Sequence, residues 1–309
     1  MVDNKFNEVL KNIERYYDGI AVNADKDIEA RISNCLNYCG IMYRVFSRKK
    51  TIESVIEKMK HKGECKYIPQ KRKMQDFIGT RITLYFKDDI DICIKQLCNI
   101  FDLVDIERDS LDTETFKPQR INCVFSAPTD GLVISKELSE KCLIDDTFEV
   151  QIRTVFSEGW HEVEHDLRYK NKGDWEDEEG KRFSRELNGL FAVLEVCDGG
   201  IVSVCENLAH DQYKKHKWGS MMRNHFRLRF RSISLSAETI EIYEREEKWK
   251  SVFRFDRARL IDAFGYTRLP ITFDNAIYLM NEIDICSKDM SLITPEIIRK
   301  RCEEYQSRV

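Results

Sequence analysis

The segment FEVQIRTVFSEGWHEVEHDLRYK, residues 148–170, constrains the fold of this chain more than any other stretch. Its first six residues alternate between apolar and polar side chains, as in a half-buried strand, so Glu149, Gln151 and Arg153 should share one face. After Thr154 the apolar residues follow helical spacing, which predicts an amphipathic helix. These apolar residues are Phe156, Trp160, Val163 and Leu167. Because the polar face of the strand carries an acid, an amide and a guanidinium in a row, we expect the chemistry here.

Composition places the chain among globular proteins that are rich in helix. Its 309 residues are 42% hydrophobic and 34% charged, enough for one large domain or two ordinary ones. With only 5 prolines and 13 glycines, structureless linkers should be few. A net charge of −4 gives no global basic signature, so contact with nucleic acid would require a local basic patch.

Cysteine usage and hydropathy indicate a cytoplasmic location. The 11 cysteines are scattered, odd in number and contain no CxxC pair, which favours reduced thiols over disulfides. The first residues are charged and amphipathic, unlike a signal peptide. No uninterrupted apolar run of about 18 residues occurs, so we expect no membrane-spanning helix and no membrane partner.

Periodicity along the chain predicts an α+β fold. Helices are expected over residues 3–23, 25–46, 88–101, 155–170 and 183–210, and another from about residue 51. Strands are expected over 76–86, 102–107, 121–125 and 148–153, with a weaker indication at 269–273. Strands mixed with helices favour a sheet covered mainly on one side, and the C-terminal part should be a mainly helical extension.

Three groups that are far apart in the sequence combine into a candidate phosphate and metal site. The cations of residues 48–50 stand immediately before a predicted helix, where the helix dipole disfavours positive charge unless an anion lies between them. Asp76 opens one predicted strand and Glu149 lies on another. Two carboxylates with nearby cations suit magnesium-dependent phosphoryl transfer, in which the acids hold the metal and the cations offset charge on the leaving phosphate. A solvated basic turn remains the alternative for residues 48–50.

Residues 161–165 spell HEVEH, the H-E-x-x-H pattern that places two histidines one helical turn apart to bind zinc. A zinc protease site is the weaker alternative, because no third ligand motif follows. The pattern has few fixed positions and arises by chance in charged helices. The polar strand before it would also have no role in such a site.

Four motifs, in order, resemble those of the RelA/SpoT-type alarmone (ppGpp) synthetases. The basic pattern R-x-K-x-x-x-S-x-x-x-K matches Arg48, Lys50, Ser54 and Lys58. The strand pattern D-x-x-x-x-R matches Asp76 and Arg81, and E-x-Q-I-R-T matches residues 149–154. The pattern E-H-x-x-x-Y-K matches Glu164, His165, Tyr169 and Lys170. The likeness extends over about residues 40–210, and the correct spacing inside each motif makes it specific.

The resemblance implies a nucleotidyltransferase-like mixed sheet flanked by helices. It implies a pyrophosphokinase, similar to the GTP diphosphokinases of the stringent response, that moves the β,γ-pyrophosphate of ATP to a ribose 3′-hydroxyl of GDP or GTP. Asp76 and Glu149 would be the catalytic residues and the Mg²⁺ ligands, with Glu149 also placed to accept the proton of the acceptor. The nucleotide-binding residues would be Arg48, Lys50, Ser54, Lys58, Arg81, Gln151, Arg153, His165 and Lys170.

One departure from the family concerns the acceptor. The G-Y-R-S-x-H motif, whose tyrosine stacks on the acceptor guanine, has no counterpart in FKPQRINCVF, residues 116–125. Stacking on an aromatic ring is worth about 1–3 kcal/mol, so its loss should weaken purine binding. Phe116, Arg120 and Asn122 are the candidates to replace it, the arginine by planar stacking. Since the ATP-side and metal residues remain, a pyrophosphokinase with a changed acceptor is favoured over a dead enzyme.

The resemblance divides the chain into N-terminal helices (1–46), a RelA/SpoT-like synthetase domain (47–212) and a mainly helical C-terminal extension (213–309). Two other functions stay open: pyrophosphorylation of the tRNA 3′ end, as in related toxins, and nucleotide sensing without turnover. For tRNA the candidate surface is a basic and aromatic cluster, and its plainer interpretation is a segment packed against the acidic residues 176–179. The cluster contains His216, Lys217, Trp218, Arg223, His225, Phe226, Arg227, Arg229, Phe230 and Arg231. The oligomeric state is open, a homo-oligomer included.

Overall fold

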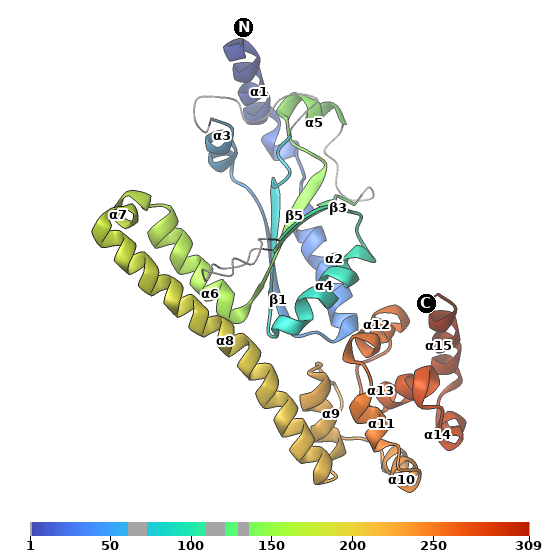
Figure 1. Cartoon of the computed structure of the whole chain (residues 1–309). Coiled ribbons are helices and arrows are strands. Elements are labelled where there is room, and N and C mark those ends of the chain that lie inside the picture. Colours follow the sequence, from blue (N-terminus) through green and yellow to red (C-terminus); the bar gives the residue numbers. More distant parts are fainter. Residues whose placement is uncertain (1, 61–72, 109–120, 129–135, 309) are drawn as a thin grey trace.

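Five strands form the mixed sheet on which the first half of the chain is built (Figure 1). The structure is a computed structural model that describes residues 2–60, 73–108, 121–128 and 136–308. The strands lie in the order β1-β2-β5-β4-β3, and β2 pairs with β5 in parallel while the other neighbours are antiparallel. Their bounds are β1 Tyr43–Lys49, β2 Ile78–Leu84, β3 Leu103–Arg108, β4 Ile121–Ser126 and β5 Thr147–Thr154.

Helices surround the sheet and make up most of the chain after it. In the first half they are α1 Val2–Tyr16, α2 Ala24–Cys39, α3 Ile52–Lys60, α4 Ile90–Cys98, α5 Lys136–Cys142, α6 Val155–Val163 and α7 Lys172–Glu176. In the second half they are α8 Glu178–Lys214, α9 Trp218–Phe226, α10 Ala237–Arg245, α11 Trp249–Arg254, α12 Arg257–Thr267, α13 Phe273–Met280, α14 Lys288–Ile293 and α15 Glu296–Arg308. Within the described residues there are also two short 3₁₀ turns, η1 Tyr17–Gly19 and η3 Lys87–Asp89, and two π-helical segments, η4 Glu164–Tyr169 and η5 Asn281–Ile285.

The predicted α+β class is confirmed, with a mixed sheet flanked by helices and a mainly helical C-terminal part. The strands expected over 102–107, 121–125 and 148–153 are present as β3, β4 and β5. The strand expected at 269–273 is wrong, because residues 269–272 have no regular structure. Thr272 there accepts a hydrogen bond from the Asn275 amide (3.1 Å) and so caps the N-terminus of α13.

The helix expected over 25–46 is also wrong in its last part, where the chain forms the edge strand β1. The preceding helix α2 ends at Cys39 because Gly40 takes the left-handed conformation (φ +73°) that often terminates helices. In β1 the apolar Phe46 is exposed and the polar Ser47 is buried. The sequence of β1 therefore lacks the regular alternation of apolar and polar residues that predicts a strand.

One face of the sheet packs against α2 and α4 (Figure 1). The Ser47 amide donates a hydrogen bond to Glu29 Oε2 on α2 (2.8 Å), and the Tyr43 hydroxyl donates to the Ser33 carbonyl oxygen (2.9 Å). On the same buried face, the hydroxyls of Ser47 and Thr80 lie 2.7 Å apart and join β1 to β2. The alternate residues of these strands therefore point to the opposite, polar face.

The C-terminal helices attach to the far side of this helical layer. Asp262 on α12 accepts hydrogen bonds from Gln96 Nε2 (2.9 Å) and Lys95 Nζ (3.2 Å) on α4. Arg257, at the start of α12, lies 2.5 Å from the carboxylate of Asp89, which is fully buried. Helix α8 runs through residues 212 and 213, so the proposed division of the chain at that point stays a prediction.

Helix α8 is long and carries many exposed apolar side chains. An 18-residue window has mean hydropathy 1.5 with at most two charged residues, so length and composition alone allow this helix to cross a membrane. The expectation of no such helix is therefore not confirmed. The helix also packs on protein, since the Leu187 carbonyl oxygen accepts from Trp160 Nε1 (3.1 Å) and the buried Asp198 from the Thr154 hydroxyl (2.6 Å). The exposed residues include Phe183, Leu190, Val193, Val196, Val204 and Leu208.

Removing the guanidinium of Arg257 should destabilise the protein by about 3–5 kcal/mol, because the buried carboxylate of Asp89 would lose its counter-charge. Burial raises the pKa of Asp89 and Arg257 opposes that shift, so the loss in Arg257→Ala should shrink as the pH falls and Asp89 takes up a proton. Urea denaturation at several pH values measures this.

The matched control is Arg254→Ala, which removes an exposed arginine from the preceding helix α11. Its effect should stay within about 0.5 kcal/mol. Adding Asp89→Asn to Arg257→Ala should recover part of the lost free energy of unfolding. Equal losses for Arg257→Ala and Arg254→Ala would show that the buried pair does not hold the helical part in place.

Candidate active site

Strand β5 presents three polar side chains on the face of the sheet that α2 and α4 do not cover. Glu149, Gln151 and Arg153 are partly exposed, while the residues between them are buried, so the alternation predicted from sequence is confirmed. Gln151 joins the other two, since its Nε2 donates to Glu149 Oε1 and its Oε1 accepts from Arg153 Nη2, both at 3.3 Å. These contacts hold the Glu149 carboxylate in one orientation.

The strand register brings a cation and a carboxylate to either side of a glycine. Gly79 on β2 pairs with Arg48 on β1 and with Glu149 on β5. Residues that pair directly across strands project from the same face, so Arg48 and Glu149 share the polar face with Gly79 between them. No atom lies within 4 Å of the position that a Cβ of residue 79 would occupy. The glycine therefore leaves an open gap between the two charged side chains.

Asp76 precedes β2 and stands among lysines from the residues before and within α3. Its Oδ2 lies 3.3 Å from Lys50 Nζ and forms a hydrogen bond and ion pair with Lys58 Nζ. Burial by itself would raise the pKa of Asp76, but the two lysines outweigh it and hold that pKa below the ordinary value. Asp76 is thus an ionised carboxylate at neutral pH.

Glu149 shows the opposite trend. Burial raises its pKa above the ordinary glutamate value, and the negative charge of Asp76 adds to the rise. The Gln151 hydrogen bond and the charges of Lys50 and Lys58 only partly oppose it. Two neighbouring carboxylates whose pKa values are displaced in opposite directions indicate separate roles, one as a fixed anion and one as a proton acceptor.

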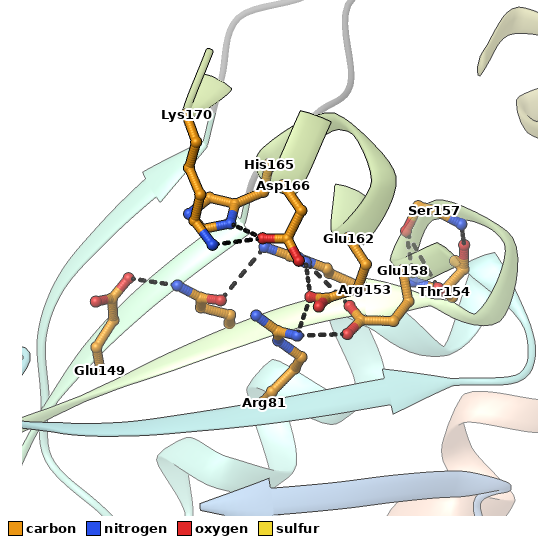
Figure 2. Close-up of polar contacts among 11 residues, drawn as sticks. Arg81, Glu149, Arg153, Thr154, Ser157, Glu158, Glu162, His165, Asp166 and Lys170 are labelled. Atoms are coloured by element: carbon orange, nitrogen blue, oxygen red, sulfur yellow. Dashed lines mark hydrogen bonds and ion pairs between the residues drawn. The ribbon is translucent and has the colours of Figure 1, made fainter. Parts of the chain in front are cut away.

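Helix α6 supplies two further acids beside Arg153, at the end of the β5 polar residues that is farther from Glu149 (Figure 2). Arg81 Nη1 donates to Glu158 Oε1 (2.7 Å) and to Glu162, and Arg153 Nη1 donates to Glu158 Oε2 (3.0 Å). Thr154 sets the start of this helix, because its hydroxyl accepts from the Ser157 amide (3.1 Å). Arg81 on β2 pairs with Gln151 on β5, two residues before Arg153, so both arginines lie on the polar face, where Glu158 bridges them.

A comparison with protein-family models matches residues 47–174 to the region found in RelA and SpoT proteins. This part of the chain is a RelA/SpoT domain. The matched range contains the two carboxylates of the candidate site, Asp76 and Glu149. It also contains Arg48 and Gly79, which pair across the strands next to Glu149.

Several solved structures resemble the chain around this RelA/SpoT domain. Small alarmone synthetase 1 from Bacillus subtilis is 22% identical over 59% of this chain and 90% of its own, with a TM-score of 0.44. A GTP pyrophosphokinase family protein from Streptococcus pneumoniae is 20% identical over 67% of this chain and 96% of its own, with a TM-score of 0.46. The comparison with curated proteins gives no match. At these identities and scores, the family assignment depends on the match of residues 47–174.

The basic residues that begin the RelA/SpoT domain point in different directions. Arg48 is exposed on the polar face, whereas Lys49 Nζ donates to the carbonyl oxygens of Tyr17 and Ile20, both at 3.2 Å. Ser54 is exposed, and its amide donates to the Thr51 hydroxyl (3.3 Å) at the start of α3. The structure therefore brings Lys50 and Lys58 to Asp76 and places Arg48 across Gly79 from Glu149. Ser54 instead contacts Thr51, the residue before its own helix.

His165 and Lys170 of the RelA/SpoT domain lie at the π-helical segment after α6 and share one partner. Asp166 Oδ1 accepts from Lys170 Nζ (2.7 Å) and lies 3.0 Å from His165 Nδ1 (Figure 2). The His165 ring also stacks on Tyr169, with centroids 5.6 Å apart. Both side chains are more than half exposed, so they remain candidates for binding a nucleotide that reaches over the sheet.

The H-E-x-x-H pattern does not assemble as a zinc site. His161 is buried beside Trp160, with ring centroids 5.5 Å apart, while His165 is exposed. Glu162, which would activate water in a zinc protease, pairs with Arg81. Among the described residues, no group of three or more histidine, cysteine or acidic side chains is arranged to hold a metal ion.

Sequence reasoning missed two residues of the polar face. Phe46 is 60% exposed and pairs directly with Arg81. It was missed because the strand that contains it was expected to be a helix. Glu158 bridges both arginines, and its only sequence signal is its position four residues before Glu162 on α6. Asn122, one candidate to replace the acceptor motif, lies on β4 directly opposite Gln151. Phe116 and Arg120 lie outside the described residues.

The C-terminal basic cluster has partners that the sequence did not indicate. Arg227 is buried and pairs with Glu206 on α8 and Asp88 beside the sheet, rather than with the acidic residues 176–179, so that expectation is wrong. Arg229 donates to the Tyr43 carbonyl oxygen (2.8 Å) and also lies over the Tyr43 ring. These arginines connect the helical part to the sheet, so they are poor candidates for binding tRNA.

The substitution Glu149→Gln should raise the free energy of unfolding at neutral and alkaline pH. Because the folded-state pKa of Glu149 is raised, ionisation opposes folding, and stability falls as the pH rises from about 4.3 through the raised value. In Glu149→Gln the free energy of unfolding does not fall in this way, because glutamine does not ionise. Below pH 4 the free energies of unfolding of the two proteins should therefore be similar. Chemical denaturation between pH 4 and pH 9 measures the difference. The exposed Glu140→Gln on α5 serves as control, and an unstable Glu149→Gln protein would contradict the assigned pKa shift.

Proposed function

We propose that this protein transfers the β,γ-pyrophosphate group of ATP to the 3′-hydroxyl of a ribose. The observation that carries the proposal is the pair of carboxylates Asp76 and Glu149, one held ionised by lysines and the other with a raised pKa. In this reaction the acceptor 3′-oxygen bonds to the β-phosphorus of ATP. The bond from the β-phosphorus to the oxygen of the α-phosphate breaks, AMP leaves, and the hydroxyl proton goes to Glu149.

Glu149 suits the role of general base. Catalytic bases work best when their pKa lies near the working pH, and a raised glutamate pKa moves in that direction. Its hydrogen bond from Gln151 fixes the carboxylate orientation, and the gap at Gly79 leaves room for a substrate oxygen beside it. A base that is both oriented and easily protonated can take the acceptor proton as the new bond forms.

Asp76 and Glu149 also suit a magnesium ion. Mg²⁺ prefers oxygen ligands and is usually held by one or two carboxylates together with substrate phosphates and water, which matches two acids without histidine or cysteine ligands. When bound, Mg²⁺ would neutralise phosphate charge and polarise the phosphoryl oxygens. Lys50 and Lys58 already stand at Asp76, and Arg48 lies across Gly79, so these three cations are placed to bind the triphosphate.

Phe46 and Asn122 are the described residues best placed to bind a nucleobase. Phe46 offers an exposed aromatic ring beside Arg81, and Asn122 offers an amide next to Gln151. An aromatic face can stack on a purine, and an amide can donate to and accept from its edge. Neither reproduces the family's tyrosine and histidine motif, so the acceptor is left to experiment.

The first experiment incubates the purified protein with Mg²⁺, ATP labelled in its β-phosphate, and one acceptor at a time. The acceptors are GDP, GTP, ADP, ATP and bulk tRNA. Structures of small alarmone synthetase 1 from Bacillus subtilis hold pppGpp and AMPCPP, and we use these ligands only to select nucleotides for the panel. Label transferred to a nucleotide supports the proposal, label on tRNA supports the tRNA alternative, and no product with any acceptor rejects both.

Glu149→Gln should lower kcat by about 100-fold or more, because it removes the proton acceptor while keeping the shape of the side chain. In the unsubstituted protein, kcat/KM should rise with pH through a pKa above the ordinary glutamate value. Asp76→Asn should also lose activity, and added Mg²⁺ should restore part of it because the defect is in metal affinity. Asp145→Asn, which changes a partly exposed acid before β5, is the control and should keep full activity.

Replacing Phe46 by leucine should raise KM for one of the two nucleotides by about tenfold, since stacking of a base on an aromatic ring is worth about 1–3 kcal/mol. Leucine keeps an apolar side chain but removes the ring, so kcat should change little. Steady-state kinetics with each nucleotide varied in turn measures the effect. The exposed Leu292→Ala on α14 provides the control, and unchanged KM values for both nucleotides would exclude Phe46 from the binding site.

A further inference from the structure

A cavity of about 830 Å³ lies where the C-terminal helices meet the helical layer under the sheet. Its walls come from α2 and α4 on one side and from α12 and α15 on the other. Because α2 and α4 cover the buried face of the sheet, this cavity is separated by the sheet from Glu149 and the polar face. Its volume is within the range of about 300–1,000 Å³ that is usual for small-molecule sites.

Positive charge dominates the cavity wall. Arg31, Lys95, Arg268 and Arg308 line it, and Asp262 is the one acidic residue among the lining positions that the structure describes. Asp262 is already engaged, since it accepts from Gln96 and Lys95 and lies 3.3 Å from the Tyr305 hydroxyl. Within the described ranges, neither Arg268 nor Arg308 has a carboxylate within 4.0 Å, so their charges are available to an anion.

Aromatic rings hold these two arginines at the cavity. The Arg268 guanidinium lies 5.5 Å from the Tyr38 ring centroid, and the Arg308 guanidinium lies 5.5 Å from that of Tyr266. The rings of Tyr266 and Tyr305 are 5.7 Å apart. Planar guanidinium groups over aromatic rings provide flat surfaces on which another planar group can stack.

The backbone of Arg268 is strained. It ends α12 in the left-handed conformation (φ 50°), where glycine is the usual residue, and its amide donates to the Phe264 carbonyl oxygen (2.8 Å). A residue other than glycine is strained in this conformation, and glycine is not. Glycine can therefore replace Arg268 without distorting the backbone.

We propose that this cavity is a second ligand site, which binds a purine nucleoside polyphosphate. The guanidinium groups of Arg268 and Arg308, with Arg31 and Lys95, would bind the phosphate groups. The tyrosine rings would stack on the purine base, and the amides of Asn34 and Asn99 would bind its edge. Binding at this site does not depend on the transfer reaction, so it can be tested independently of the proposed function.

The first test counts nucleotide sites by calorimetry with ATP and with GTP, using Glu149→Gln protein to prevent turnover. Arg268→Gly should weaken one class of sites at least tenfold while leaving the other class unchanged. Because glycine accepts the left-handed conformation, this variant should fold with equal or greater stability. The control Arg182→Ala removes an exposed arginine from α8 and should bind as the unsubstituted protein does. Equal nucleotide binding with and without Arg268 would overturn the proposal.

The second test locates the ligand through Cys35, a partly exposed residue that lines the cavity. A hydrogen bond with Cys39 lowers the pKa of Cys35, which favours reaction with maleimide. Labelling measured for each peptide should slow at Cys35 when ATP or GTP is added, but not at the exposed Cys197 on α8. Protection should disappear in Arg268→Gly. Unchanged labelling at saturating nucleotide, or equal protection by inorganic triphosphate, would reject a site for nucleotides.

Discussion

The parallel pairing of β2 with β5 is the constraint on which the site depends. It sets Gly79 opposite Glu149, while the antiparallel pairing with β1 sets Gly79 opposite Arg48. A shift of one residue in either register would turn these side chains into the core, because alternate residues of a strand face opposite sides. The buried face under α2 and α4 excludes such a shift, since its apolar residues must stay covered. The core of the sheet thus specifies the geometry of the polar face.

Charged residues in this protein serve two purposes that charge alone does not distinguish. At the polar face, lysines hold Asp76 ionised while burial raises the pKa of Glu149, so similar side chains acquire different properties. At the junction with the C-terminal helices, Arg227 is buried, Arg257 is largely buried, and both bind the acids of η3. A buried ion pair contributes little net stability but is costly to break, so it specifies how the two parts fit together.

Sequence patterns located the fold class and most of the polar face, and failed where the polarity of a strand was irregular. The alternation of β5 was clear, and Asp76 and Glu149 could be proposed as partners. β1 was mistaken for helix because an outward Phe46 and an inward Ser47 disturb its alternation, so a candidate for base stacking was overlooked. The basic cluster after α8 was predicted as a candidate surface for tRNA, because the sequence does not show that Arg227 is buried.

By itself, the sequence determined the α+β class, the strand that carries Glu149, and a RelA/SpoT-type set of motifs. Those features are local, since they depend on side-chain period and on spacing within a few residues. Tertiary structure decided which distant groups meet: Arg48 across Gly79 from Glu149, and Arg257 against Asp89. It also created the cavity lined by Arg268 and Tyr38, whose residues are far apart in the chain. Pairing of distant strands and packing of distant helices place these groups together, and no local pattern records that.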